Sequence, residues 1–255
     1  MLEEELVSVI MPVFNGEENV SESIESVIGQ TYKNWELIII DDASNDATHE
    51  KISSYHDSRI KTFKNEINLG PLLSRDSGQL KSKGTYIAFL DADDVWHEDK
   101  LRVHLNFMRK ENTNFSYTDY TVFSPKGQKK VNCPKKYNLS SMFKNSGIAL
   151  SSCIYKKNDN SFHFFGDHYP YTEHFFFLSI FSEMYEGKKC PHNLLNFRVH
   201  DSMSSDKIKV IKYIFNIYRN NHGFSYVFSF FIVLRIMLSA LPRVFKKFLL
   251  KKNYD

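Results

Sequence analysis

The residues of this chain best suited to chemistry are three carboxylates within four positions, Asp91, Asp93 and Asp94. They follow a run of strand-forming apolar residues over 86–90. Burying carboxylates that repel one another is costly unless positive charge is supplied. Hard divalent cations prefer oxygen ligands, and Mg²⁺ is usually held by one or two carboxylates together with substrate phosphates. The cluster therefore predicts a metal and phosphate site. The simpler alternative is an acidic loop in which Asp94 or Asp99 caps the next helix.

Two further apolar runs lie upstream, and both also end in polar residues. Residues 7–15 predict a short buried strand that ends in Pro and Asn, and residues 35–40 predict a second strand that ends at Asp41 and Asp42. Between them, residues 19–30 carry apolar side chains at helical spacing. A crossover helix of this length returns the chain in the same direction, so the pattern predicts a β-α-β unit with parallel strands.

The polar residues that end the three predicted strands should meet at one edge of the sheet, because ligands of parallel sheets bind beyond the carboxyl ends of the strands. These residues are Pro12 and Asn15, Asp41 and Asp42, and Asp91 and Asp93. Strands that read as continuous apolar runs also fit a sheet covered on both faces. We therefore predict an α/β fold with a mostly parallel central sheet flanked by helices.

Four motifs occur in a fixed order in the first half of the chain. They are Val-Ser-Val-Ile-Met-Pro-Val-Phe-Asn (7–15), Asp-Asp-Ala-Ser-Asn-Asp (41–46), Asn-Leu-Gly (68–70) with Ser-Arg-Asp (74–76), and Gly-Thr-Tyr-Ile-Ala-Phe-Leu-Asp-Ala-Asp-Asp (84–94). Together they closely resemble the inverting family 2 glycosyltransferases of GT-A fold. The match covers about residues 6–110, and residues 171–174 and 197–200 match more weakly. The resemblance implies the GT-A fold and a metal-dependent, inverting sugar transfer.

The resemblance also implies roles for most residues of the predicted crevice. It makes Asp93 the direct ligand of Mn²⁺ or Mg²⁺, with Asp91 reaching the ribose and the water shell of the ion. It makes Asp42 the acceptor for the uracil N3–H of a UDP-sugar. The backbone of Pro12, Val13 and Phe14 would line the base, with Asn15 nearby, and Ala92 would also contact the nucleotide-sugar. Arg75 would supply a positive charge for phosphate. His200 lies in a stretch that resembles the motif folding over the diphosphate, and it is a candidate metal ligand. The alternative for Arg75 is a surface ion pair with Asp76 or another acid.

Inversion by a single displacement requires one group that takes the proton from the attacking acceptor hydroxyl. The resemblance places this base at Glu173. Two alternatives stay open, His174, because imidazole accepts a proton near neutral pH, and Asp167. The usual Glu-Asp pair of the family reads Glu173-His174 or Thr172-Glu173 here, so the base is not determined. Trp96 is expected to line the acceptor side, where sugars stack on aromatic faces, or else to lie in the core.

The charge of the chain is unevenly distributed. From residue 203 to the end there are ten Lys and Arg against two Asp, a balance of +8, which leaves −5 for residues 1–202 of a chain with net charge +3. The basic part contains an apolar run over 224–241 that Arg235 interrupts and that barely reaches the roughly 20 residues of a membrane-spanning helix. An in-plane helix with basic flanks fits the pattern better. A helix pair packed on the catalytic domain is the alternative.

The length of 255 residues suits one large domain with an appendage. We predict a catalytic domain over 1–202, with a nucleotide-binding half (1–110) and an acceptor half (111–202), and a basic, apolar helical region over 203–255. Three scattered cysteines predict no zinc site or disulfide framework and favour a reducing compartment. The N-terminus is acidic where a signal peptide is basic. We therefore expect a cytoplasmic protein, peripheral on the inner face of the cell membrane.

The function expected from these features is the transfer of one hexose or N-acetylhexosamine from a UDP-sugar to a polyprenyl-diphosphate-linked saccharide, in the synthesis of bacterial O-antigen or capsule. Nucleic acid is not an expected partner, because no reader motif accompanies the basic region. A catalytically inactive scaffold at a membrane is one alternative. A nucleotidyltransferase is another, although it ordinarily has a basic, Gly-rich loop after its first strand, where residues 12–18 are acidic. The oligomeric state is not indicated.

Overall fold

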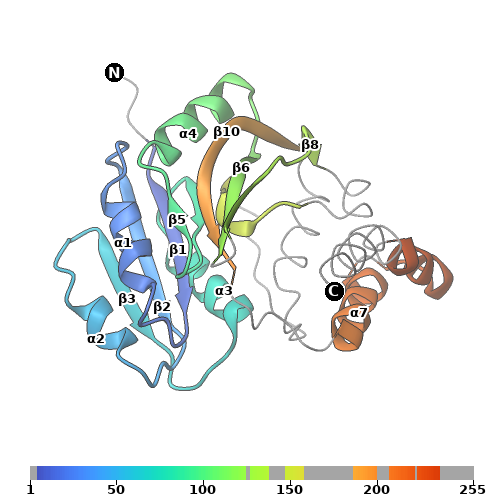
Figure 1. Ribbon diagram of the computed structural model, residues 1–255, viewed down its shortest axis with the longest axis horizontal. Helices are drawn as coiled ribbons and strands as arrows, with labels where there is room; N and C mark the ends of the chain where they lie inside the picture. The colour runs from blue at the N-terminus through green and yellow to red at the C-terminus, as the bar shows by residue number, and fades with distance from the viewer. Residues whose placement is uncertain are drawn as a thin grey trace, which may run out of the picture.

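A computed structural model describes residues 5–124, 127–137, 147–157, 186–199, 207–221 and 223–235 of the chain. Its centre is one ten-stranded sheet (Figure 1). The strands are β1 (Val7–Val13), β2 (Trp35–Asp41), β3 (Ile60–Lys64), β4 (Tyr86–Phe89), β5 (Val95–Trp96), β6 (Phe115–Ser124), β7 (Gly127–Val131), β8 (Lys136–Tyr137), β9 (Cys153–Lys156) and β10 (Gly187–Arg198). Their order is β3-β2-β1-β4-β9-β6-β10-β5, with β7 beside β6 and β8 beside β10.

Helices flank this sheet. The helical segments are α1 (Val20–Ile28), α2 (Thr48–Ser53), α3 (Pro71–Lys81), α4 (Lys100–Lys110), a 3₁₀ turn (Leu150–Ser152), α7 (Lys207–Asn216), a π turn (Ile217–Asn221) and residues 226–235. Helix α3 contacts β1 and β2, whereas α4 contacts β6 and β10. Helix α7 lies on the far side of the molecule from β2 and β3 (Figure 1). Within the part of the chain that the structure describes, no helix is long and apolar enough to span a membrane.

The first half of the sheet is parallel. Strand β1 pairs in parallel with β2, from Val7 opposite Trp35 to Val13 opposite Asp41, and also in parallel with β4. Every residue of β1 and β2 is buried, as expected for strands covered on both faces. The predicted α/β fold and its β-α-β unit are therefore confirmed. The crossover helix begins at Val20, after Asn19, and ends two residues earlier than the pattern indicated.

Helix α3 packs unusually close to β1, and Gly78 permits this. A Cβ atom at Gly78 would lie 2.5 Å from Cγ2 of Ile10, so any larger side chain would push the helix away from the strand. Arg75 lies three residues earlier, on the same face of the helix. The close packing therefore sets how far the Arg75 side chain reaches beyond the end of the strand.

The second half of the sheet contains both parallel and antiparallel pairs. One of its strands, β10, comes from a distant part of the chain. Strand β9 is antiparallel to both β4 and β6, while β10 is parallel to β6 and antiparallel to β5. The basic segment 129–136 begins within β7, which pairs antiparallel with β6. Its lysines are exposed, and charged side chains are typical of a strand at the edge of a sheet.

Two buried titratable side chains connect α4 to the strands. Lys100 and His104 are both 0% exposed. Lys100 Nζ donates to the carbonyl of Ser152 at 2.9 Å and lies 3.2 Å from His104 Nδ1. His104 Nε2 lies 2.8 Å from Ser116 Oγ. Burial lowers the pKa of Lys100 to about 8, and burial together with the neighbouring lysine lowers the pKa of His104 well below its ordinary value.

The substitution Lys100→Met should remove the part of the pH dependence of the free energy of unfolding that is due to titration of Lys100. The pKa of Lys100 is about 8 in the folded chain, against an ordinary value of 10.5. Between these values the unfolded chain binds more protons, so this side chain makes the free energy of unfolding rise with pH. Below about pH 8 both states are protonated and its contribution is constant.

Urea unfolding of both proteins from pH 7 to 10 checks this expectation. The wild-type free energy of unfolding, minus that of Lys100→Met, should increase above pH 8 by up to about 1.4 kcal/mol per pH unit. Titrations of cysteine and tyrosine are common to both proteins and cancel in the difference. A difference that stays flat to pH 10 would show that Lys100 keeps its ordinary pKa in the fold.

Candidate active site

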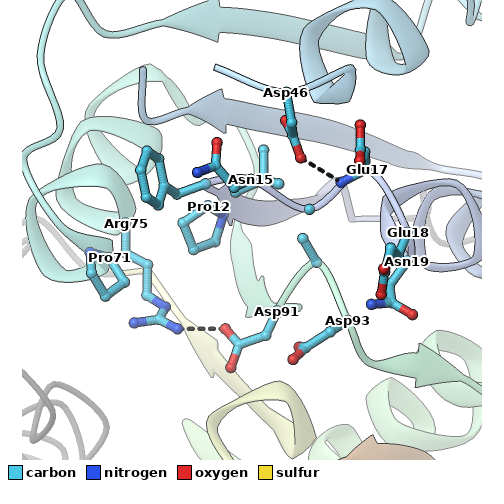
Figure 2. Close-up of a pocket in the computed structure, with 14 residues that line it drawn as sticks. Pro12, Asn15, Glu17, Glu18, Asn19, Asp46, Pro71, Arg75, Asp91 and Asp93 are labelled. Atoms are coloured by element: carbon cyan, nitrogen blue, oxygen red, sulfur yellow. Dashed lines mark hydrogen bonds and ion pairs between the residues drawn. The ribbon is translucent and has the colours of Figure 1, made fainter. Parts of the chain in front are cut away.

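A pocket of about 610 Å³ opens where β1 and β4 end (Figure 2). It is lined by residues 12–19 at the end of β1 and beyond it, Asp46 after β2, Pro71 and Arg75 of α3, and residues 91–93 after β4. This is the edge of a parallel sheet at which ligands bind. Of the predicted site residues, the structure brings together Pro12, Val13, Phe14, Asn15, Arg75, Asp91, Ala92 and Asp93.

A partly buried ion pair forms one side of this pocket. The guanidinium of Arg75 pairs with the carboxylate of Asp91 (Figure 2). Only 7% of the Arg75 side chain is exposed, so most of its hydration has been replaced by protein contacts. The backbone N–H of Asp91 donates to Ser151 Oγ at 3.1 Å. Arg75 thus pairs with an acid, but inside the pocket and not at the surface as the alternative expected, and its role toward phosphate stays a prediction.

The third carboxylate of the acidic loop (residues 91–94) lies in the core. Asp94 is 0% exposed and does not line the pocket. Its Oδ1 accepts the backbone N–H of Arg198 at 2.9 Å, and Ser23 Oγ donates to its carbonyl at 2.7 Å. Burial raises the pKa of Asp94 well above its ordinary value, and the charges of Asp91 and Asp93 raise it further. Asp94 therefore does not cap α4, whose N-cap is Asp99.

Asp42 lies behind the pocket wall. It is 2% exposed. Its carboxylate accepts three hydrogen bonds at 2.7–2.9 Å, from the Asn65 amide and from the backbone N–H groups of Leu69 and Gly70. These contacts hold the loop that leads into α3, whose first residue, Pro71, lines the pocket. In this structure Asp42 supports the pocket through that loop, and its role toward uracil stays a prediction.

A network of hydrogen bonds joins the loops that follow β1 and β2. The backbone N–H of Asn15 donates to Ser44 Oγ at 3.0 Å, and Asn15 Oδ1 accepts the N–H of Asn45 at 3.0 Å. Glu17 and Asp46 continue the network, since the N–H of Glu17 donates to Asp46 Oδ2 at 3.2 Å. Asn15 has a φ of +50°, a left-handed conformation that Asn tolerates better than most residues. The wall is therefore held in place before any ligand binds.

Several pocket residues were missed from the sequence. Glu18 and Asn19 line the pocket on the side of Asp93, opposite Arg75 (Figure 2). Glu17 and Asp46 also line it. The signal for two of them in the sequence is the pair of acids Glu17 and Glu18, which follows the first strand.

Trp96 does not reach the pocket. It is 3% exposed, and its indole N–H donates to the carbonyl of Ser151 at 2.8 Å. The ammonium of the buried Lys100 lies 5.3 Å from the centre of the ring. The expectation that Trp96 lines the acceptor side is therefore wrong for this structure, and its alternative, a place in the core, is correct. The reason is that β5 pairs with β10 and is carried into the sheet.

The donor set of the acidic loop fits a hard divalent cation. Asp91 and Asp93 both line the pocket, and two carboxylates together with substrate phosphates are a usual coordination for Mg²⁺. Among the described residues, no group of three His, Cys, Asp or Glu side chains is arranged to hold a metal by itself. Glu173, His174, Asp167 and His200 lie outside the described residues, so their predicted roles stay predictions.

Comparison with known proteins identifies the family to which this chain is similar. The sequence matches the family model of Glycosyl transferase family 2 over residues 8–177. It is 34% identical over 217 residues to the Escherichia coli UDP-Glc:alpha-D-GlcNAc-diphosphoundecaprenol beta-1,3-glucosyltransferase WfgD, covering 83% of this chain and 84% of that protein. It is 30% identical over 220 residues to the Bacillus subtilis putative teichuronic acid biosynthesis glycosyltransferase TuaG, covering 84% of this chain and 87% of the relative.

The fold is also similar to a solved structure. The structure of S. aureus TarS 1-349 in complex with UDP-GlcNAc superposes with a TM-score of 0.73 at 17% identity, over 92% of this chain and 72% of that one. At this identity the likeness shows the fold, which is the GT-A fold that the motifs implied. Together with the matched family model and the pocket at the carboxyl ends of β1 and β4, it shows that the chain belongs to glycosyl transferase family 2 and is a glycosyltransferase.

Proposed function

We propose that this glycosyltransferase moves one hexose from a UDP-sugar to a saccharide carried on a polyprenyl diphosphate, with inversion at the anomeric carbon. The observation that carries the proposal is the pocket that combines Arg75, Asp91 and Asp93 with the wall formed by residues 12–15. The relative WfgD is named for UDP-Glc and for a GlcNAc-diphosphoundecaprenol acceptor. UDP-glucose is therefore the first donor to test, and UDP-N-acetylhexosamines are the second.

The donor would lie along the pocket from residues 12–15 to the acidic loop. Phe14 is 48% exposed and offers an apolar surface for the base. Asp93, with Asp91, would hold Mn²⁺ or Mg²⁺, which when bound would neutralise charge on the departing diphosphate. Arg75 would add a second positive charge. Its ion pair with Asp91 places this charge in the pocket before the donor arrives.

The acceptor hydroxyl must lose a proton as it attacks, and Glu173 remains the proposed base. His174 and Asp167 are its alternatives. Whichever group it is, the base must face the anomeric carbon from the side opposite the diphosphate and must accept a proton there. An inactive scaffold is not favoured by any observation, since Arg75, Asp91 and Asp93 are all in the pocket. Membership of the glycosyltransferase family removes the reason for proposing a nucleotidyltransferase.

The substitution Asp93→Ala should abolish metal-dependent transfer from UDP-glucose to a GlcNAc-diphosphate-lipid acceptor. The side chain lines the pocket and lies in a cluster of like charges, so its removal should leave the fold intact. Activity should fall at least tenfold, which corresponds to about 1.4 kcal/mol of activation free energy. Radiolabelled sugar transfer with and without Mn²⁺ measures the effect, and the melting temperature checks folding.

The matched control is Asp57→Ala, which removes a carboxylate that pairs with Arg59 and does not line the pocket. It should transfer sugar at close to the wild-type rate. If Asp93→Ala keeps more than a tenth of wild-type activity, Asp93 is not the essential metal ligand.

We also propose that the helical residues 226–235 hold the enzyme at the membrane surface, where a polyprenyl-linked acceptor resides. The apolar side chains on this helix that are 37–69% exposed are Tyr226, Val227, Phe228, Phe230, Phe231 and Leu234. Five further bases follow in the sequence between residues 243 and 252. An exposed aromatic face beside basic residues suits the interface of an anionic bilayer.

Replacing Phe230 and Phe231 together by Ser should weaken binding to anionic vesicles. Each ring is more than half exposed, so the double variant loses apolar area that would enter the interface and little that supports the fold. Co-sedimentation with phosphatidylglycerol vesicles at low and high salt measures binding, and salt should weaken the wild type through screening. Leu80→Ser, which removes a side chain 56% exposed on α3, is the control. A wild-type protein that stays in the supernatant at low salt contradicts the proposal.

A further inference from the structure

Arg198, the last residue of β10, contacts three segments of the chain, one of which is the acidic loop. Its Nε–H donates to the carbonyl oxygen of Asp93 at 2.9 Å, and its backbone N–H donates to Asp94 Oδ1 at 2.9 Å. Its guanidinium pairs with Glu22 of α1 and lies 4.4 Å from the centre of the Phe123 ring on β6. One side chain thus reaches the acidic loop, the first helix and a neighbouring strand.

The contact at Asp93 acts on the peptide between Asp93 and Asp94, because Arg198 binds the carbonyl oxygen of that peptide. Ser23 Oγ holds the next peptide, since it donates to the carbonyl of Asp94 at 2.7 Å. A carbonyl held by a charged donor does not rotate freely, because rotation would break a charge-assisted hydrogen bond. The Asp93 carboxylate stems from the same backbone unit, so the direction in which it enters the pocket depends on this contact.

The strand that carries Arg198 is itself fixed against the segment that follows the acidic loop. Strand β10 pairs with β5, with Asn196 opposite Val95, and the carbonyl of Leu194 accepts the N–H of His97 at 3.1 Å. The chain continues along β6, where the N–H of Val199 donates to the carbonyl of Phe123 at 3.1 Å. The backbone from which the Arg198 side chain extends is therefore fixed by strand pairing.

Arg198 does not line the pocket, and 22% of its side chain is exposed. It has no direct route to a ligand there and can act only through the groups that it holds. We propose that Arg198 is a positioning residue, which holds the Asp93 carbonyl so that the Asp93 carboxylate is directed to bind a divalent cation together with the donor diphosphate. This inference rests on the proposed function, because it assigns a support to the same metal site.

Mn²⁺ binding by the full-length protein in the presence of UDP tests the inference, with the free ion followed by electron paramagnetic resonance. Arg198→Met keeps the stem and removes the guanidinium contacts to the Asp93 carbonyl, to Glu22 and to the Phe123 ring. It should weaken Mn²⁺ binding roughly 10–100-fold, the usual effect of removing a group that orients a metal ligand. UDP affinity measured without metal should change little. Arg198→Lys keeps the charge without the planar group that reaches both Asp93 and Glu22, and it should be intermediate.

Glu22→Gln separates positioning from simple charge pairing. It removes the ion pair with Arg198 and leaves the contact to the Asp93 carbonyl, so Mn²⁺ affinity should stay near wild type. Arg102→Met, which removes a guanidinium 51% exposed on α4, is the control for loss of a positive charge. If Glu22→Gln weakens Mn²⁺ binding as much as Arg198→Met does, the role of Arg198 is ion pairing and the inference fails.

The remaining outcomes are also decisive. Wild-type Mn²⁺ affinity in both Arg198→Met and Arg198→Lys, with binding lost in Asp93→Ala, overturns this inference and leaves the proposed metal site standing. A wild-type protein that binds no Mn²⁺ beside UDP overturns the metal site and this inference together. If Arg198→Met does not fold, the melting temperature will show it, and Arg198→Lys then decides the question.

Discussion

The structure around the pocket depends on how the chain tolerates several carboxylates at the end of one strand. Asp91, Asp93 and Asp94 would repel one another strongly if all three were charged and buried. The fold separates them. Asp91 receives the guanidinium of Arg75, while Asp94 is buried with its pKa raised and accepts an N–H from β10. Asp93 then faces the pocket beside Asp91, where a cation and phosphate can complete its environment.

The two halves of the sheet contribute differently to this arrangement. The parallel half brings the ends of β1 and β4 to one edge, and the hydrogen bonds between the loops after β1 and β2 hold the pocket wall. Asp42 holds the loop that leads into α3. The close packing of α3 on β1 then positions Arg75 at the pocket. The mixed half contributes contacts to the acidic loop, because Ser151 accepts the N–H of Asp91 and Arg198 donates to the carbonyl of Asp93. The pocket at the end of the first half is therefore held in shape partly by residues of the second half.

A pocket formed by one half of the sheet and supported by the other half suits a glycosyltransferase. The proposed donor carries a diphosphate whose charge must be met by positive groups, and preorganised groups need not reorganise during the reaction. A rigid wall on one side and an ion pair on the other provide that preorganisation without closing the pocket. The exposed aromatic side chains of residues 226–235 lie on a helix outside the sheet, so membrane binding there would not disturb the strands that form the pocket.

The sequence alone determined the parallel β-α-β unit, the family resemblance and the principal pocket residues, because apolar runs and the polar residues at their ends are local patterns. Only the tertiary structure decided which carboxylates face the pocket, why Trp96 is buried, and that Asp42 supports a loop. It also brought Arg198 to Asp93, 105 positions earlier in the chain. The physical reason is that periodicity shows which side of an element is buried, whereas contacts across the sheet depend on strand order. The insertion of β10 between β6 and β5 is a long-range pairing that no local pattern encodes.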